Sequence, residues 1–304
     1  MPTTQVSTST KVKNILYLTD FSEPSEAALL FAATLARGYR AKVHALHVLI
    51  PAPYVYMPPG LAAAAIEVAE ECAQTEMQRV ESLLVGLEIK TLVERGIEVW
   101  PAVRRAIEED NVDLIVLGTH GRTGAEKLLL GSVAEEIFRR SPVPVLTIGP
   151  GVRSSVHNGG RFHRVLFATD FTPESLAGAP YAVTLAQENQ ARLLLLLVMR
   201  KPSPVNEGDK EFFDMSVAEA MHRLYEIVPR DAHLDLPPEV AVEYGDPADR
   251  IVEFATQRGA DLIVIGVRSA AGRLGAATHL ERATAHKIVA HAHCPVLTAR
   301  DPRF

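Results

Sequence analysis

The chain has 304 residues, 47% of them hydrophobic and 22% charged, which is enough for about two domains that each bury a core. Its formal net charge is −6 and its basic residues are scattered among acidic ones, a pattern that argues against a nucleic-acid partner. The two cysteines form no CxxC pair, residues 1–13 contain no apolar signal segment, and the longest aliphatic run, Leu193–Met199, is far too short to span a bilayer. We therefore expect a cytoplasmic protein with no membrane partner.

In the first half of the chain, apolar runs of β type alternate with helical stretches. Runs that are apolar throughout suit strands buried on both faces of a parallel sheet, and right-handed crossover helices then cover each side. The pattern predicts an α/β fold with a doubly wound parallel sheet. The predicted strands are Ile15–Thr19, Val43–Ile50, Ile89–Glu94, Leu114–Leu117 and Val143–Ile148.

The first helix carries clear boundary signals. Ser22 is expected to cap it, Pro24 falls in the first turn, and the alanine- and leucine-rich stretch 27–37 runs up to Gly38, which is expected to stop it.

The chain contains an internal sequence repeat. ILYLTDFSEPSEAAL from Ile15 matches VLFATDFTPESLAGA from Val165, and DLIVLG from Asp113 matches DLIVIG from Asp261. A repeat period near 150 residues corresponds to a whole domain. We expect two tandem domains, 1–150 and 161–304, joined by the polar, glycine-rich linker 151–160.

The segment Gly118–Ser132 reads GTHGRTGAEKLLLGS and lies between a predicted buried strand and the helical stretch SVAEEIFRR. A strand, a loop whose glycines let backbone N–H groups approach a ligand, and a helix N-terminus together make an anion site. The spacing G-x2-G-x9-G-[S/T] therefore predicts a phosphate site. In an open α/β sheet such a site lies at the carboxyl ends of the strands, where the strand order reverses.

Each candidate side chain also has a plain structural explanation. Asp20 either accepts hydrogen bonds from a nucleotide or caps the first helix; Gly121 and Gly131 either admit a phosphate or satisfy turn geometry; Ser132 either donates to a phosphate or caps the next helix. Three residues of the same loop are as well explained by a position on the loop surface: Arg122, Lys127 and His120. The segment after the second strand either covers an adenine or forms an ordinary loop, and its candidate residues are Tyr54, Tyr56 and Met57. His286, His291, His293 and Cys294 lack the spacing of a zinc motif, so no metal site is expected.

With these residues in place, the sequence resembles the universal stress protein family in its tandem two-domain form, over nearly the whole chain. The resemblance implies an adenine nucleotide alpha hydrolase-like fold, with a five-stranded parallel sheet flanked by helices in each domain. In members that bind ATP, the loop holds ribose and phosphates, and the first two strand ends contact adenine. Carried over by motif position, the nucleotide-binding residues are Asp20, Val48, Leu117, Gly118, His120, Gly121, Gly131, Ser132 and Val133.

The second half departs from this pattern. It keeps Asp170, Val198 and Gly266, but Ser269 replaces the second glycine of the loop. The Gly-Ser pair aligns with His279–Leu280 when counted forward and with Arg282–Ala283 when counted back, and neither alignment restores the phosphate loop. We expect one competent nucleotide site, in the first domain. The second domain is then structural, regulatory or a weak nucleoside site built on the three retained residues.

The sequence favours a stress-response protein that uses ATP, or ADP or AMP, as a structural or signalling ligand. Fast catalysis is not indicated, because there is no GxxxxGK[S/T] motif and no evident pair of carboxylates placed to hold a metal. Two alternatives remain open: a slow ATP hydrolase or self-phosphorylating protein, and a nucleotide-independent interaction module. The resemblance also implies that the two domains pair through their last strands. It leaves open a further homodimer and a role for Mg²⁺.

Overall fold

A computed structural model describes residues 12–50, 59–119, 130–149, 152, 161–199, 216–267 and 276–300, without the side chains of residues 59 and 276–283. The chain divides into two compact units, one built mainly from Lys11–Pro150 and the other from Arg161–Phe304. In the described residues, no helix has both the length and the apolar character needed to cross a membrane.

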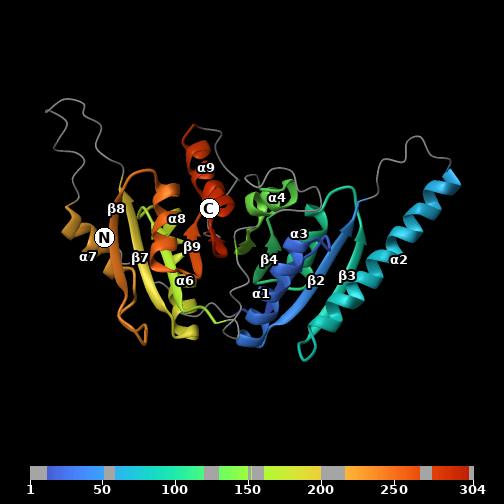
Figure 1. Ribbon diagram of the computed structural model, residues 1–304, viewed down its shortest axis with the longest axis horizontal. Coiled ribbons are helices and arrows are strands. Elements are labelled where there is room, and N and C mark those ends of the chain that lie inside the picture. The colour runs from blue at the N-terminus through green and yellow to red at the C-terminus, as the bar shows by residue number, and fades with distance from the viewer. Residues whose placement is uncertain are drawn as a thin grey trace. The chain divides into compact units, whose positions relative to one another are not determined.

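The first domain alternates strands and helices from end to end (Figure 1). Its sheet has the order β3-β2-β1-β4-β5, and every strand pair with a resolved register is parallel. The predicted strands are all present, with bounds that differ by one or two residues. The elements are β1 Asn14–Leu18, α1 Glu23–Tyr39, β2 Lys42–Leu49, α2 Pro59–Leu83, β3 Ile89–Arg95, α3 Trp100–Glu109, β4 Leu114–Gly118, α4 Ser132–Arg140 and β5 Val145–Ile148.

The strand order reverses between β1 and β4. From β1 the chain moves outward through β2 to β3, then returns to the other side of β1 to form β4 and β5. Because crossover connections between parallel strands are right-handed, α1 and α2 cover one face of the sheet and α3 and α4 the other. The carboxyl ends of β1 and β4 therefore flank the point at which an open α/β sheet usually binds its ligand.

Burial follows position in the sheet. The central strands β1 and β4 are buried over most of their length, as the apolar runs predict. Strand β3, at the edge, is only half-buried and ends on an exposed Arg95, so the prediction that every strand is buried on both faces is wrong for β3. An edge strand has a neighbour on one side only, and its backbone and side chains stay nearer to water.

Helix α1 differs from its predicted boundaries at both ends. Ser22 occupies the N-cap position, but its hydroxyl makes no bond to the helix and donates instead to Asp20. Gly38 lies inside the helix, which continues to Tyr39 and ends where Arg40 adopts a left-handed φ of 53°. The left-handed turn that ends a helix is usually made by glycine, and here an arginine makes it one residue beyond the helix.

The second domain repeats this topology with the order β8-β7-β6-β9-β10, again with parallel pairs. Its first connection is split into the short helix α5 and the longer helix α6. The elements are β6 Arg164–Thr169, α5 Pro173–Leu176, α6 Ala179–Asn189, β7 Arg192–Met199, α7 Val217–Glu226, β8 Glu239–Tyr244, α8 Pro247–Arg258, β9 Leu262–Gly266, α9 Ala276–His291 and β10 Val296–Ala299.

Candidate functional site

The predicted site residues of the first domain that the structure describes lie along the carboxyl edge of its sheet. Leu18 and Leu117 are register partners on β1 and β4, so Gly118 lies one residue and Asp20 two residues beyond this pair, on either side of the switch point. Leu117 is buried and Asp20 is half-buried. Sequence positions about 100 residues apart are thus brought to one edge by the parallel pairing of β1 with β4.

The turn after β1 is a closed hydrogen-bond network. The Asp20 carboxylate accepts from the Ser22 N–H at 3.1 Å and from the Ser22 hydroxyl at 2.5 Å. The Thr19 hydroxyl accepts from the Phe21 N–H at 3.0 Å and lies 3.1 Å from the Ser25 hydroxyl, while Phe21 itself has a left-handed φ of 61°. Asp20 therefore fixes the entry into α1, which is the structural role that the sequence left open.

Gly118 is required by packing. A Cβ built on Gly118 would lie 2.7 Å from the carbonyl oxygen of Pro24, 2.8 Å from its carbonyl carbon and 3.1 Å from the Ser25 nitrogen. These are backbone atoms of the first turn of α1 and cannot rotate away. The end of β4 therefore touches the start of α1 directly, and the glycine at this position needs no ligand to explain it.

The end of β2 completes this edge with a residue that the sequence analysis missed. His47 is buried, its Nδ1 lies 2.8 Å from the Thr19 carbonyl oxygen, and its ring centroid lies 4.4 Å from that of Phe21. Val48, the predicted adenine contact, is half-buried and packs near Gly96, where an added Cβ would come within 3.3 Å of Val48 Cγ1. No sequence signal marked His47, because only the strand pairing places it beside the turn after β1.

The described ends of the loop between β4 and α4 are held together. The Gly131 N–H donates to the Thr119 carbonyl at 2.7 Å, and Thr119 and Leu130 are both buried. Residues 120–129 lie outside the described residues, and with them the predicted binding residues His120 and Gly121 as well as Arg122 and Lys127. Tyr54, Tyr56 and Met57 also lie outside.

Gly131 takes the N-cap position of α4, so of the two alternatives for Ser132 the helix cap is ruled out: Ser132 is the first helical residue. Gly131 has φ −60° and ψ 148°, angles that any residue adopts, so the backbone does not demand a glycine here. The first bond of the helix runs from Glu135 N to Gly131 O. The N–H groups of the three residues before Glu135 thus have no acceptor within the helix, and a glycine cap offers them no side chain.

The same edge of the second domain keeps the turn. The Asp170 carboxylate accepts from the Thr172 N–H at 3.0 Å and from the Thr172 hydroxyl at 2.6 Å, and Phe171 has a left-handed φ of 63°. Partial desolvation favours a higher pKa for Asp170, but hydrogen bonds, led by those from Thr172, outweigh it and hold the pKa below its usual range. A Cβ on Gly266 would lie 2.1 Å from the Glu174 carbonyl oxygen.

The phosphate-loop positions of the second domain differ. Helix α9 begins at Ala276, so both alignments of the missing Gly-Ser pair, His279–Leu280 and Arg282–Ala283, fall inside a helix instead of at its start. Ser269 lies outside the described residues, and Val198 is half-buried near the end of β7. What the second domain retains, Asp170 and Gly266, is what turn geometry and packing require.

A second group of polar residues lies at the amino edge of the first-domain sheet, where no sequence motif indicates a site. His44 is buried, with Nδ1 3.4 Å from an Asp110 carboxylate oxygen and without a hydrogen bond, and Nε2 3.2 Å from the Asn14 side chain. Lys90 holds Asp110 at 2.7 and 2.9 Å. Burial lowers the pKa of His44, against the opposing effect of Asp110, so we interpret His44 as a neutral core residue.

Over the part of the chain that the structure describes, no cluster of three or more His, Cys, Asp or Glu side chains is placed to hold a metal ion. Cys294 is buried, and this burial raises the pKa of its thiol to about 12. Such a thiol stays protonated at neutral pH and is a poor nucleophile or ligand.

Comparison with known proteins identifies the family of both domains. The sequence model of the universal stress protein family matches residues 11–149 and again 161–300. A universal stress protein of Mycolicibacterium smegmatis is 24% identical over 300 residues, covering 94% of this chain and 96% of that protein. Universal stress protein MJ0531 of Methanocaldococcus jannaschii is 34% identical over 139 residues, covering 45% of this chain and 81% of that protein.

Among solved structures, a universal stress protein from Archaeoglobus fulgidus superposes with a TM-score of 0.68 at 22% identity, covering 94% of this chain and 98% of that chain. This likeness extends the shared fold over both domains. Together with the two family matches, it leads to one conclusion: the chain belongs to the universal stress protein family.

Proposed function

We propose that this protein binds ATP in its first domain and uses the nucleotide as a structural or signalling ligand in a stress response. The binding residues in this proposal are those expected from the family resemblance: Asp20, Val48, Leu117, Gly118, His120, Gly121, Gly131, Ser132 and Val133. Of these, Ser132 and Val133 would meet the phosphates with backbone N–H groups, whereas the Gly131 N–H is bonded to the Thr119 carbonyl.

One observation carries the proposal: in the described part of the chain, no side chain caps the start of α4. Three backbone N–H groups lack an acceptor within the helix, and their cap is a glycine whose backbone angles would suit a serine or an aspartate equally well. By contrast, α5, α7 and α8 of the second domain are capped by the side chains of Thr172, Ser216 and Asp246. Helix α6 also has a glycine N-cap, Gly178, but the backbone angles of that glycine are helical. A glycine in a place that normally favours a capping side chain supports the view that a ligand phosphate supplies the cap.

The comparison between the domains supports a single site. The strand-ending aspartate and the glycine after the fourth strand, which both domains share, have turn and packing roles in each domain and do not by themselves indicate a nucleotide site. Two features are specific to a phosphate loop: the glycine spacing, and a glycine N-cap with extended backbone angles. In the described residues the extended glycine cap occurs at Gly131 only, because Gly178 before α6 has helical angles. The second domain, with Asp170, Val198 and Gly266, would bind at most a nucleoside.

Slow turnover is a second candidate function, and one observation favours it. Ser132 is an exposed hydroxyl at the first position of α4, where the proposed triphosphate would lie. Transfer of the γ-phosphoryl group to this hydroxyl, or to water, would make the protein a self-phosphorylating protein or a slow hydrolase. Either transfer leaves ADP, so ADP as the resident ligand would be consistent with both outcomes.

The remaining parts of the proposal depend on the resemblance alone. By analogy with the family, we propose a cytoplasmic location and pairing of the two domains through their last strands. Cross-linking mass spectrometry on the full chain tests this pairing. It is a better measurement than the hydrodynamic radius of an isolated second domain, because it does not require that domain to fold alone.

The proposal is tested by calorimetric titration of ATP into the wild type and into Gly131→Val. Valine fits the extended backbone angles of Gly131, so the variant should fold, but its side chain would occupy the space in front of the helix. We expect ATP affinity to fall by about tenfold or more, because several charge-assisted hydrogen bonds are lost together.

Gly38→Val is the matched control, since a Cβ at Gly38 meets no atom within 4 Å and the residue lies inside α1, in the same domain. This variant should bind ATP as the wild type does. Equal affinity in Gly131→Val and in the wild type would refute the site. No binding by the wild type would favour the nucleotide-independent interaction module.

A further inference from the structure

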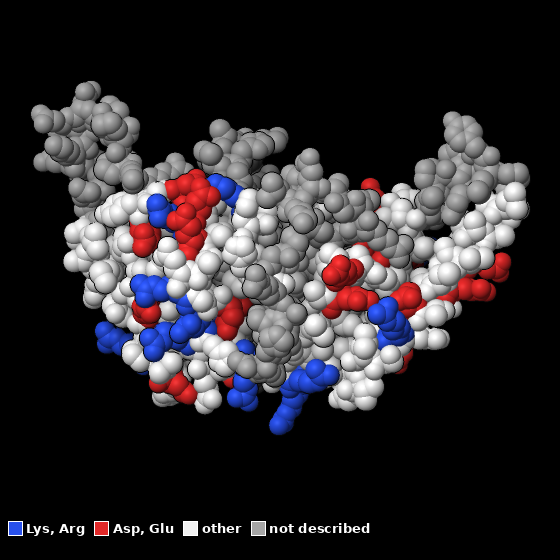
Figure 2. Space-filling view, viewed as in Figure 1, with Lys and Arg blue, Asp and Glu red and all other residues white. Residues whose placement is uncertain are grey.

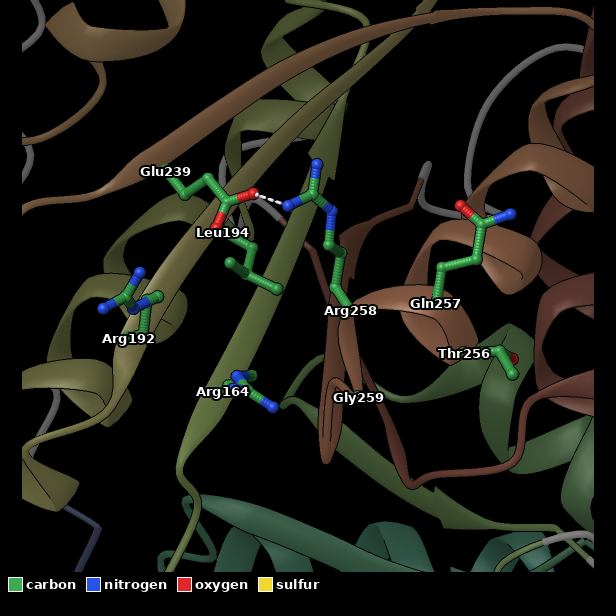
Figure 3. A pocket seen from close by; sticks show the side chains of 8 residues that line it. All are labelled: Arg164, Arg192, Leu194, Glu239, Thr256, Gln257, Arg258 and Gly259. Carbon is green, nitrogen blue, oxygen red and sulfur yellow. Dashed lines mark ion pairs between the residues drawn. The ribbon is translucent and has the colours of Figure 1, made fainter.

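A pocket of about 370 Å³ opens at the amino edge of the second-domain sheet. It is lined by residues that begin three neighbouring strands, Arg164 on β6, Arg192 on β7 and Glu239 on β8, and by Arg258 at the end of α8 (Figure 3). Ligands of open α/β sheets usually bind at the opposite, carboxyl edge. This pocket is therefore separate from the type of site proposed for the first domain.

Two of its arginines stand side by side. Arg164 and Arg192 are direct register partners on adjacent parallel strands, and partners of this kind project from the same face of the sheet. Like charges placed opposite each other on neighbouring strands repel. Both side chains are exposed, so water and salt weaken this repulsion without removing it.

Nearby carboxylates do not neutralise this pair. Glu239 is held by Arg258 at 2.5 Å, and the Asp261 carboxylate accepts the backbone N–H groups of His163 and Arg164 at 2.6 and 3.0 Å. Among the described residues, no carboxylate lies within ion-pair distance of the guanidinium groups of Arg164 or Arg192. Figure 2 shows Lys and Arg side chains gathered over the part of the second domain where β7 and α6 lie in Figure 1.

The first domain supplies an internal comparison at the same place. Its strands begin with Asn14 and Lys42, which are register partners as Arg164 and Arg192 are. Asn14 is neutral, and Lys42 is paired with Glu88 at 3.0 Å. The two unmatched cations are therefore particular to the second domain and do not follow from the fold.

The neighbouring ion pair is kept in both domains with its charges reversed. In the first domain Lys90 on the edge strand holds Asp110 after α3, whereas in the second domain Glu239 on the edge strand holds Arg258 on α8. Because the ion pair occurs in both domains with opposite charges, we interpret it as a structural contact between the edge strand and the end of the helix that precedes the next strand. It accounts for Arg258 and Glu239, and it leaves Arg164 and Arg192 unaccounted for.

We propose that this pocket binds a small anion that carries two adjacent phosphate groups, held by Arg164 and Arg192. The planar guanidinium fork matches phosphate oxygens in a bidentate manner, and two adjacent forks match a diphosphate better than a single charge. The volume is in the range of small-molecule sites. The second domain would then be a ligand-sensing domain with a chemistry of its own, independent of the nucleotide site proposed for the first domain.

Inorganic pyrophosphate, titrated calorimetrically into the full chain in EDTA at low salt, tests the proposal. We expect Arg164→Gln together with Arg192→Gln to weaken pyrophosphate binding by about tenfold or more, because each glutamine removes a charge and a bidentate contact. Arg250→Gln is the matched control: Arg250 belongs to the same domain, but its partner is Glu253 on the surface of α8. It should leave the affinity unchanged.

Gly131→Val distinguishes this site from the proposed phosphate loop and should bind pyrophosphate as the wild type does. The proposal is overturned if the double variant binds as tightly as the wild type, if Gly131→Val abolishes binding, or if the wild type does not bind. Arg192→Lys provides a second check that keeps the charge. It should bind more weakly than the wild type because the fork is lost, and equal binding would mean that only net charge acts.

Discussion

Replacing Gly118 or Gly266 by alanine should destabilise the domain that contains it, because each glycine lies against the backbone of a helix start. At Gly118 the new Cβ would approach the Pro24 carbonyl to 2.7 and 2.8 Å, against an ordinary contact of 3.4 to 4 Å. The first turn of α1 would have to move by roughly 1 Å, and overpacking of this kind costs about 1–3 kcal/mol. At Gly266 the approaches of 2.1 and 2.4 Å are tighter, and we expect about 3 kcal/mol or more.

The two domains can be followed separately. Trp100 is the only tryptophan and begins α3, so its fluorescence reports the first domain, whereas far-ultraviolet circular dichroism reports both. In urea, Gly118→Ala should move the fluorescence transition to lower concentration. Gly266→Ala should move only the part of the dichroism transition that the fluorescence does not follow.

Gly38→Ala is the control, and it should raise the stability of the first domain instead of lowering it. A Cβ at Gly38 meets nothing within 4 Å, and alanine in a helix interior is favoured over glycine by about 0.5–1 kcal/mol. If Gly118→Ala unfolds at the same urea concentration as the wild type, β4 does not touch α1 as described. Packing against the start of α1 would then not explain why this position is a glycine.

Three further predictions address individual side chains. Asp20→Ala and Asp170→Ala should each lower the free energy of unfolding by about 1 kcal/mol, because the hydrogen bonds of the turn are lost. Only the Asp20 variant should lose ATP affinity. An equal loss of ATP affinity in both variants, or no loss in either, would contradict the proposed role of Asp20. Because burial lowers the pKa of His44, its stabilising effect should be complete above about pH 6.5 and fall as the pH drops below that; His44→Leu should flatten the pH dependence of first-domain unfolding. In the native protein a thiol reagent should modify exposed Cys72 rapidly and buried Cys294 only on unfolding, and rapid reaction of both would contradict the packing of β10.

Much of the fold could be predicted, because buried parallel strands leave a direct signal. The run LIVLG at Leu114 is apolar for the reason that it is central in the sheet, and the internal repeat fixes the second domain once the first is understood. Helix ends were less predictable. Gly38 has the residue type of a stop signal, but helix α1 continues past it to Tyr39, and Arg40 makes the left-handed turn that ends the helix.

The site was predictable only as far as local motifs reach. Asp20 could be recognised from the predicted strand that it follows. The glycine-spaced segment before α4 could be recognised because its residues lie within one short stretch of sequence. His47, His44 and the arginine pair of the second domain could not, because each acquires its neighbours through strand register across dozens of residues. The packing role of Gly118 could not be predicted for a related reason: the sequence shows that a residue is glycine, and only the structure shows which atoms a side chain there would contact.

The most direct test of the central claim is the stoichiometry of bound nucleotide. The purified full chain is denatured, its small molecules are extracted, and any nucleotide is identified and quantified by mass spectrometry after saturation with ATP and removal of the excess. The account predicts about one adenine nucleotide per chain, absent from Gly131→Val and present in Gly38→Val. About two nucleotides per chain would contradict the single-site argument, and none would contradict nucleotide binding itself.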